Sequence, residues 1–279
     1  MNLPSPIEEI HDALFDEKLI KVFVKRDDLI HPIISGNKWR KLREYIQFAQ
    51  FNEIKQIISF GGAYSNHLYA LAFATKAFGI QSIGIVRGEE LHTNSNPYLS
   101  QLNDWGMQLH FATRAEYQLK SIPETIDVDN SLIIAEGGFG IEAIQGIKEL
   151  TNEIKSSNQF QHIICPIGTG STYLGLCHSI QDVKVHGILT LNNKTEIEEN
   201  SIKLKIPIQE IHENYIFGKY AKASNELDIF CGQFHNKHQI KIEPIYTGRM
   251  FYGLYDLISK EYFKPGSKIL ALHTGGIKD

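Results

Sequence analysis

The stretch Gln56-Ile57-Ile58-Ser59-Phe60-Gly61-Gly62 indicates the fold most directly, because a short apolar run stops there at two glycines. Apolar runs of this length, bounded by turn residues, are typical of a strand that is buried on both faces. Ser65 then supplies a good N-cap, and apolar residues from Leu68 to Ala72 recur at helical spacing. The stretch therefore predicts a unit of strand, glycine loop and helix.

The same unit recurs along the chain. Further strands are expected at residues 21–25, 82–86, 107–111, 131–135, 162–166, 184–189 and 268–272. Further helices are expected at residues 38–51, 97–105, 114–120, 141–155, 173–179, 196–204, 226–237 and 249–263. Strands that alternate with helices form parallel sheets with helices on their faces. The expected fold class is therefore α/β, and the pattern is weakest between residues 205 and 223.

Length and composition indicate an ordinary folded protein. A chain of 279 residues favours two domains or one large α/β unit. A net charge of −4 argues against a nucleic-acid partner, because phosphate backbones are bound by clustered positive charge. No uncharged apolar stretch approaches the ~20 residues that cross a bilayer. Residues 1–9 lack the basic and apolar runs of a signal peptide, so a cytoplasmic protein without a membrane partner is expected.

The cysteines and histidines give no clear metal site. Cys165, Cys177 and Cys231 form an odd set without close pairs, so reduced thiols are expected. Cys231, His235 and His238 have helical spacing, but no fourth ligand lies nearby. A solvated helix face is the simpler interpretation, and no metal is expected.

A cluster of basic residues opens one of the expected helices, within Ser35-Gly36-Asn37-Lys38-Trp39-Arg40-Lys41-Leu42. Gly36 supplies a loop and Asn37 an N-cap, so Lys38 falls in the first helical turn. Helix N-termini favour anions, and the field there disfavours the ammonium form of a lysine. A neutral amine at Lys38 would serve as a nucleophile or Schiff-base former. The alternative is a solvated basic face that begins early in the helix.

A second glycine-rich loop, Gly168-Thr169-Gly170-Ser171-Thr172, lies between an expected strand and an expected helix. Backbone amides and a helix N-terminus converge on a phosphate in such a position. The loop lacks the Gly-Lys-Ser/Thr of a Walker A motif, and Tyr173 stands at the third glycine of a dinucleotide fingerprint. The remaining candidate ligand is a single phosphate monoester. The alternative is that the loop only packs the strand against the helix, as many loops of this kind do.

Six motifs, in order along the chain, give the sequence a family resemblance. They are Val24-Lys25-Arg26-Asp27-Asp28-Leu29, residues 35–42, Gly61-Gly62-Ala63-Tyr64-Ser65-Asn66-His67, residues 168–172, Pro244-Ile245-Tyr246-Thr247-Gly248 and His273-Thr274-Gly275-Gly276. The sequence resembles the 1-aminocyclopropane-1-carboxylate deaminase and D-cysteine desulfhydrase family, a branch of the tryptophan-synthase-β-like, fold type II pyridoxal phosphate enzymes.

This resemblance implies two open, mostly parallel three-layer α/β/α domains with the cofactor in the cleft. The expected larger, cofactor-binding domain comprises residues 1–45 and 145–279, and the smaller one residues 46–144. A homodimer with a small amino-acid substrate is expected.

The resemblance also assigns roles to individual residues. Lys38 would hold pyridoxal 5'-phosphate as a Schiff base and, once displaced by substrate, move the Cα proton. Asn66 would contact the 3-oxygen of the ring and, with Ser65 and His67, the substrate carboxylate. Ser65 and Tyr246 join Lys38 as expected catalytic residues, with Tyr246 as acid or base. Plain N-capping explains Ser65 and Asn66 equally well, and packing explains Tyr246.

The expected phosphate site comprises Gly168, Thr169, Gly170, Ser171 and Thr172. The loop departs from the family pattern, in which a glycine is common at position 171 and an alanine at position 174.

Thr247 separates two activities within the family. Deaminases that open the cyclopropane ring carry a glutamate after the tyrosine, which keeps the pyridine nitrogen protonated. The hydroxyl of Thr247, or of Thr274, can bind that nitrogen but cannot supply this charge. The expected function is therefore D-cysteine desulfhydrase-like β-elimination, giving pyruvate, ammonia and sulfide. The alternatives are 1-aminocyclopropane-1-carboxylate deaminase and a non-catalytic cofactor-binding protein.

Overall fold

The structure is a computed structural model that describes residues 1–157, 159–217 and 225–276. The chain divides into two compact units, a larger one of Met1–Asn37 with Ile147–Asp279 and a smaller one of Lys38–Gly146. The chain passes between the units inside two helices, α2 (Asn37–Phe51) and α6 (Ile141–Ser157). The sequence predicted domains of residues 1–45 with 145–279 and of residues 46–144. These limits remain a prediction.

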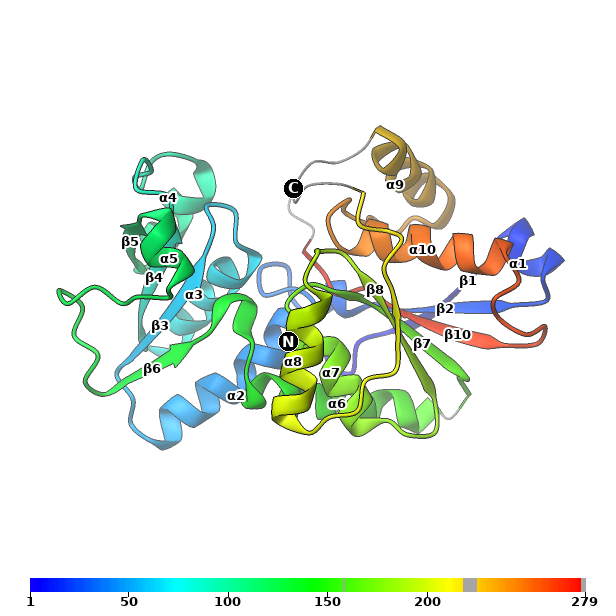
Figure 1. Cartoon of the computed structure of the whole chain (residues 1–279), viewed down its shortest axis with the longest axis horizontal. Coiled ribbons are helices and arrows are strands. Elements are labelled where there is room, and N and C mark those ends of the chain that lie inside the picture. Colours follow the sequence, from blue (N-terminus) through cyan, green and yellow to red (C-terminus); the bar gives the residue numbers. More distant parts are fainter. Residues whose placement is uncertain (158, 218–224, 277–279) are drawn as a thin grey trace. The chain divides into compact units, whose positions relative to one another are not determined.

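The larger unit contains a six-stranded sheet in the order β1-β2-β10-β7-β8-β9 (Figure 1). Its strands are β1 (Ile7–Ile10), β2 (Lys21–Lys25), β7 (His162–Ile167), β8 (Lys184–Leu189), β9 (Glu210–His212) and β10 (Lys268–Leu272). β1 pairs antiparallel with β2, and every other neighbouring pair is parallel. The parallel strands are apolar along most of their length because helices cover both faces.

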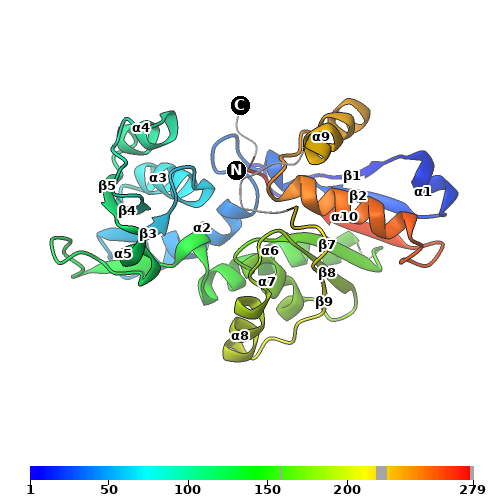
Figure 2. The same cartoon turned by 45° about the horizontal axis from the view of Figure 1, so that its top comes forward.

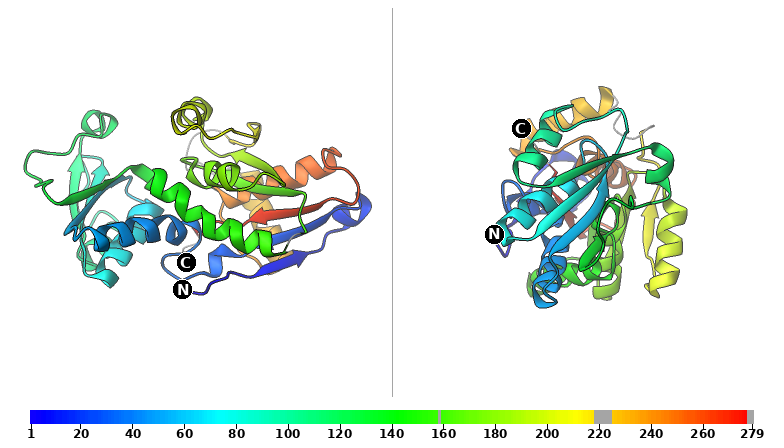
Figure 3. Two further views of the ribbon diagram at one scale, coloured as in Figure 1. Left: turned by 90° about the horizontal axis from the view of Figure 1, so that it is seen from below. Right: turned by 90° about the vertical axis from the view of Figure 1, so that its left-hand side faces the viewer.

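The helices of the larger unit bury both faces of this sheet. α1 (Ala13–Glu17), α9 (Asn225–His238) and α10 (Thr247–Ser259) share one core with strand residues such as Val22 and Ile164. α6, the long green helix in the left panel of Figure 3, packs with α7 (Ser171–Ser179) on the other face. A Cβ on Gly175 of α7 would lie 2.7 Å from Ile147 of α6, so only glycine permits this approach. α8 (Lys194–Leu204) follows β8.

The smaller unit contains a four-stranded, wholly parallel sheet in the order β5-β4-β3-β6. Its strands are β3 (Gln56–Gly61), β4 (Gln81–Arg87), β5 (Gln108–Ala112) and β6 (Ser131–Ile134). α5 (Arg114–Gln118) brings Tyr117 into a core with Ile58 and Ile85. α3 (Asn66–Phe78) and α4 (Pro97–Asp104) lie side by side in Figure 2. Trp39 of α2 stacks on Phe78 of α3 with ring centroids 6.2 Å apart.

The α/β class and the mostly parallel sheets expected from the sequence are confirmed. Every expected strand is present, with its ends within one residue of the predicted limits. Three helices begin two residues earlier than predicted, α7 at Ser171, α8 at Lys194 and α10 at Thr247. α10 also ends earlier, at Ser259. α1, β1 and β9 were not predicted. β9 lies in the segment with the weakest pattern, and residues 218–223 of that segment lie outside the described residues.

Candidate active site

Each sheet has one point where the order of its strands reverses. In the larger unit β8 and β9 follow β7 to one side, and β10 returns to the other side of β7. In the smaller unit β4 and β5 follow β3 to one side, and β6 returns to the other side of β3. Ligands of open α/β sheets bind beyond the carboxyl ends of the strands at such a reversal. A ligand site is therefore expected at the loops after β7 and β10 in the larger unit, and at those after β3 and β6 in the smaller one.

The glycine loop after β7 (residues 168–172) is built to receive an anion. Gly170 has a φ of +95°, and a Cβ there would lie 2.4 Å from Ile197 Cδ1, so only glycine fits. This left-handed residue starts α7 at Ser171, where the first backbone N–H groups lack intrahelical partners. The Ser171 hydroxyl is buried and has no hydrogen-bond partner among the described residues. A phosphate bound here would satisfy both the hydroxyl and the N–H groups.

Asn37 joins the glycine loop to the segment that precedes Lys38. Its Nδ2 donates a 2.9 Å hydrogen bond to Oγ1 of Thr172. Its backbone N–H donates to the carbonyl of Thr274, in the loop after β10, at 3.3 Å. A Cβ on Gly36 would lie only 1.9 Å from that same carbonyl oxygen, so glycine is required. The two loops at the reversal of the larger sheet thus fix the residue next to Lys38.

The charged motif that begins at Lys25 supports this arrangement from within the larger unit. Lys25 Nζ forms a buried 2.5 Å ion pair with Glu153 and donates to the Ser5 carbonyl at 2.6 Å. The Ser5 hydroxyl donates to Asp27, whose backbone carbonyl accepts from the Gly36 N–H at 2.8 Å. These contacts hold the turn before Lys38 in place.

The loop after β10 contains a neutral histidine. His273 Nε2 donates to the Lys241 carbonyl at 2.6 Å, which leaves Nδ1 to accept from the Gly275 N–H at 3.2 Å. Complete burial lowers the pKa of His273, so the ring is neutral at neutral pH. Thr274 is 7% exposed, and no hydrogen bond of its hydroxyl is found among the described residues. That hydroxyl can therefore bind a ligand.

Tyr246 and Thr247 lie at the start of α10. A Cβ on Gly168 would lie 3.0 Å from Cε1 of Tyr246, so the tyrosine ring packs against the glycine loop. Thr247 is completely buried, and its hydroxyl lies 3.1 Å from a carboxylate oxygen of Glu243.

Glu243 is a residue that the sequence reasoning missed. Its carboxylate accepts from the backbone N–H groups of Ile245 (2.7 Å), Tyr246 (2.9 Å) and Thr247 (2.7 Å). It therefore caps α10, and burial raises the pKa of its carboxyl to about 7. The available signal was a carboxylate four residues before the first helical residue, close enough in sequence to accept from N–H groups at the helix start, which lack intrahelical partners.

In the smaller unit, Ser65 caps α3 as predicted. Its Oγ accepts from the Leu68 N–H at 3.2 Å, and Asn66 is the first helical residue. Ser65 and Asn66 are half-buried at the carboxyl end of β3. The N-capping interpretation is thus confirmed for Ser65, and its expected contact with a substrate stays a prediction.

His67 is buried, and its protonation state follows from its neighbours. Its Nε2 lies 2.8 Å from the Ser59 hydroxyl, which itself donates to the Ile134 carbonyl at 2.8 Å. Since the single proton of Ser59 is used, Nε2 must be the donor and Nδ1 a bare acceptor. Burial, followed by the positive charges of Lys38 and Lys41, lowers the pKa of His67 to about 3. Only the Nδ1 side of this neutral ring remains for the predicted substrate contact.

The loop after β6 completes the reversal in the smaller sheet and was not singled out from the sequence. Gly137 and Gly138 have φ values of +68° and +71°. A Cβ on Gly138 would lie 3.1 Å from the His67 ring, so glycine keeps the backbone against that ring. The signal was available, because a glycine pair follows within a few residues of the strand end, much as Gly61-Gly62 stands at the end of β3.

The basic residues at the start of α2 do not form a solvated face. Arg40 is 0% and Lys41 5% exposed, and Lys38 is half-buried. Lys38 and Lys41 lie close enough to His67 to lower its pKa. The alternative interpretation, a solvated basic face, is therefore wrong.

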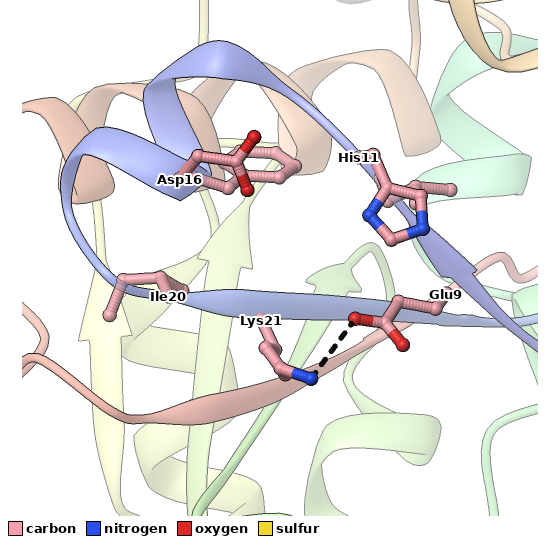
Figure 4. Close-up of a pocket in the computed structure, with 7 residues that line it drawn as sticks. Glu9, His11, Asp16, Ile20 and Lys21 are labelled. Carbon is pink, nitrogen blue, oxygen red and sulfur yellow. Dashed lines mark ion pairs between the residues drawn. The ribbon is translucent and has the colours of Figure 1, made fainter.

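A pocket of about 240 Å³ lies elsewhere on the larger unit (Figure 4). It is lined by Glu9, Ile10, His11, Phe15, Asp16, Ile20 and Lys21. Lys21 begins β2 and pairs with Lys268, the first residue of β10, so the pocket lies by the amino ends of the parallel strands. It is thus separate from the loops at the carboxyl ends.

Two absences hold for residues 1–157, 159–217 and 225–276. No group of three or more histidine, cysteine or acidic side chains there could hold a metal ion. No helix in those ranges is both long and apolar enough to cross a membrane.

Comparison with known proteins decides the family. The sequence pattern of the family described as "Pyridoxal-phosphate dependent enzyme" matches residues 3–275. The chain belongs to this family. Its cofactor is accordingly pyridoxal phosphate. The residues around the glycine loop fit the phosphate of that cofactor, because the buried Ser171 hydroxyl has no hydrogen-bond partner in the described part of the chain.

The relatives of this pyridoxal phosphate enzyme carry two names. A Pyrococcus horikoshii protein provisionally named 1-aminocyclopropane-1-carboxylate deaminase is 28% identical, with 92% of this chain and 84% of the relative covered. The D-cysteine desulfhydrase of Salmonella typhi is 25% identical, with 98% and 92% covered. The resemblance drawn from the six motifs is therefore confirmed at the level of the family.

Solved structures agree on the fold. The crystal structure of an ACC deaminase homologue matches with a TM-score of 0.83 and 27% identity, covering 99% of this chain and 90% of that one. Serine racemase from Dictyostelium discoideum matches with a TM-score of 0.72, 16% identity and coverages of 99% and 93%. The fold is that of the fold type II pyridoxal phosphate enzymes.

Proposed function

We propose that this enzyme is D-cysteine desulfhydrase-like and eliminates the β-substituent of D-cysteine or another small β-substituted D-alanine. With D-cysteine the products are pyruvate, ammonia and sulfide. The observation that carries the proposal is the hydroxyl of Thr247, where the resembled ring-opening deaminases have a glutamate. The nearby carboxylate of Glu243 is occupied by the backbone N–H groups of Ile245, Tyr246 and Thr247. Elimination of a good leaving group from the β-carbon needs less electron withdrawal by the cofactor ring than the opening of a cyclopropane ring does.

In this proposal Lys38 holds the cofactor. The glycine loop binds the phosphate of the cofactor, chiefly through the Ser171 hydroxyl. Bound there, pyridoxal phosphate supplies an electron sink for the electron pair left when the Cα proton departs. Once the substrate has displaced Lys38, the free amine of Lys38 accepts that proton. The helix N-terminus and the nearby charge of Lys41 favour the neutral amine.

The remaining residues bind and orient in this proposal. Ser65 and the first N–H groups of α3 bind the substrate carboxylate, because a helix N-terminus favours an anion. Asn66 contacts the 3-oxygen of the ring, and the hydroxyl of Thr274 serves the ring nitrogen as a neutral partner. The hydroxyl of Thr247 already donates to the Glu243 carboxylate and accepts from the Glu243 N–H. Tyr246, packed on Gly168, holds or moves a proton beside the substrate.

The test is to incubate the holoenzyme with D-cysteine and measure sulfide and pyruvate together. L-cysteine is the stereochemical control, and a Lys38→Ala variant is the control for the site. The proposal expects equal amounts of sulfide and pyruvate from D-cysteine and neither product from the variant.

The second candidate is 1-aminocyclopropane-1-carboxylate deaminase, which the names of the Pyrococcus relative and the solved homologue favour. Release of 2-oxobutanoate from the cyclopropane substrate, without sulfide from D-cysteine, would establish it instead. A protein with the absorbance of the bound cofactor that releases no oxo acid from any amino acid would be the non-catalytic alternative.

We also propose a cytoplasmic homodimer that binds neither nucleic acid nor membrane. The net charge of −4 supports the exclusion of nucleic acid. Light scattering of the purified holoenzyme tests the dimer, since a monomer mass would contradict it.

A further inference from the structure

Tyr64 is an exposed aromatic residue at the carboxyl end of the smaller sheet. Its side chain is 66% exposed, although it directly precedes Ser65, the cap of α3. The two residues belong to one turn after β3, closed by a 3.0 Å hydrogen bond from the Ser65 N–H to the Gly62 carbonyl. Tyr64 is therefore the sequence neighbour of Ser65, which is proposed to bind the substrate carboxylate.

A chain of aromatic contacts supports the Tyr64 ring. Tyr64 meets Tyr98 with centroids 5.4 Å apart and planes at 70°. Tyr98 meets Tyr69 at 5.5 Å, Tyr69 meets Trp105 at 4.7 Å, and Trp105 meets Phe73 at 5.2 Å. Such tilted and edge-to-face contacts are individually favourable. The supporting rings belong to α3 and to α4 with its C-cap residue Trp105.

A hydrogen bond also ties α4 to the turn that carries Tyr64. Asn96, the N-cap of α4, accepts from the Leu99 N–H at 3.0 Å and donates to the Ala63 carbonyl at 3.5 Å. The backbone of the turn is thereby linked to the start of α4, next to the Tyr64–Tyr98 pair. The Tyr64 ring is supported on one edge while most of its surface faces solvent, so it offers an apolar surface beside Ser65.

We infer that Tyr64 and Tyr98 form an aromatic rim that binds the β-substituent of the substrate. The substrate class is then cysteine S-conjugates whose sulfur carries an aryl or aralkyl group. This inference rests on the proposed function and narrows its substrate. The Cβ–S bond breaks, sulfur leaves with a proton as the thiol, and one water converts the remaining three-carbon imine to pyruvate and ammonium. The overall balance is one S-conjugate and one water to one thiol, one pyruvate and one ammonium.

The test uses ligands that cannot eliminate, so that binding is measured without turnover. D-2-amino-5-phenylpentanoate has the shape of S-benzyl-D-cysteine with a methylene in place of sulfur, and D-alanine lacks the aryl group. Both are titrated into the holoenzyme, and the visible absorbance of the cofactor gives each Kd. We expect the aryl ligand to bind at least about tenfold more tightly, since an aromatic pair adds to the burial of apolar area.

Variants assign this preference to the Tyr64 ring. Tyr64→Ala should reduce the ratio of the two Kd values by about fivefold to tenfold, whereas Tyr64→Phe should retain it. Phe51→Ala is the matched control, because Phe51 is an 88% exposed ring on α2 and should leave the ratio unchanged. No aryl preference in the parent enzyme, or a preference that survives Tyr64→Ala, refutes the rim. Its loss in Tyr64→Phe refutes a role for the ring as opposed to the hydroxyl.

The rim and the proposed reaction fail in different ways. Aryl-selective binding without pyruvate from D-cysteine or S-benzyl-D-cysteine refutes the reaction and keeps the rim. Pyruvate from D-cysteine without aryl selectivity keeps the reaction and refutes the rim.

Discussion

The substitution Ser171→Ala should make the cofactor-free protein more stable and the cofactor weaker in binding. Ser171 is 0% exposed, and its hydroxyl has no hydrogen-bond partner among the described residues. A buried polar group without a partner costs about 1–3 kcal/mol. Removing the oxygen should therefore raise the free energy of unfolding by about 1 kcal/mol, since the small space left behind offsets part of the gain. For a chain of this size that is a rise of about 2–4 °C in Tm.

The same oxygen should stabilise the bound cofactor. A hydroxyl that donates to a phosphate forms a charge-assisted hydrogen bond, worth about 2 kcal/mol. Its loss should weaken the apparent affinity for pyridoxal phosphate by about 30-fold. Opposite signs for stability and affinity are the signature of a residue kept for binding at the expense of stability.

The assay needs cofactor-free protein, prepared by removing the cofactor with hydroxylamine and dialysis. Urea denaturation then gives the free energy of unfolding, and absorbance on titration with pyridoxal phosphate gives the affinity. Ser179→Ala, at the last residue of the same helix, is the control and should change neither quantity much. A less stable Ser171→Ala protein, or one that binds the cofactor as tightly as the parent, would refute the reasoning.

Three more predictions follow from the geometry. Borohydride reduction of the holoenzyme should attach the cofactor to Lys38, and peptide mapping that finds it on another lysine would contradict the site. Lys25→Met should destabilise the fold by about 3–5 kcal/mol in urea, because Glu153 loses its buried partner; the double variant with Glu153→Leu should recover much of this loss. Burial lowers the pKa of His186 to about 3, so the folded protein keeps this ring neutral while the unfolded chain binds a proton below about pH 6.5. Stability should therefore fall as pH falls from 6.5, by up to about 1.4 kcal/mol per pH unit from this residue, and urea titrations of His186→Gln should show a slope shallower by that amount.

Local signals were enough to predict most elements of the fold. The Ser65 cap lies within three residues of the N–H that it binds, and the apolar runs of β3 and β7 are continuous in sequence. β1 was missed because only four residues form it, and its burial comes from pairing with β2 rather than from an apolar pattern. The start of α10 was misplaced because Glu243 caps it through a carboxylate four residues away.

The candidate site was predicted in part. The glycine loop and Lys38 could be read from sequence, since glycine and lysine at a helix start are local features. The contact of Gly138 with the His67 ring could not, because residues distant in sequence meet there only when β6 pairs with β3.

The sequence by itself determined the alternation of strands and helices, the glycine loop before α7 and the lysine at the start of α2, because each depends on neighbouring residues. Only the tertiary structure decided where each sheet reverses, that His67 is neutral with its proton on Nε2, and that no described residue is a hydrogen-bond partner of the Ser171 hydroxyl. Strand order, desolvation and hydrogen-bond satisfaction depend on which distant residues share a buried volume, and that is fixed only when the chain has folded.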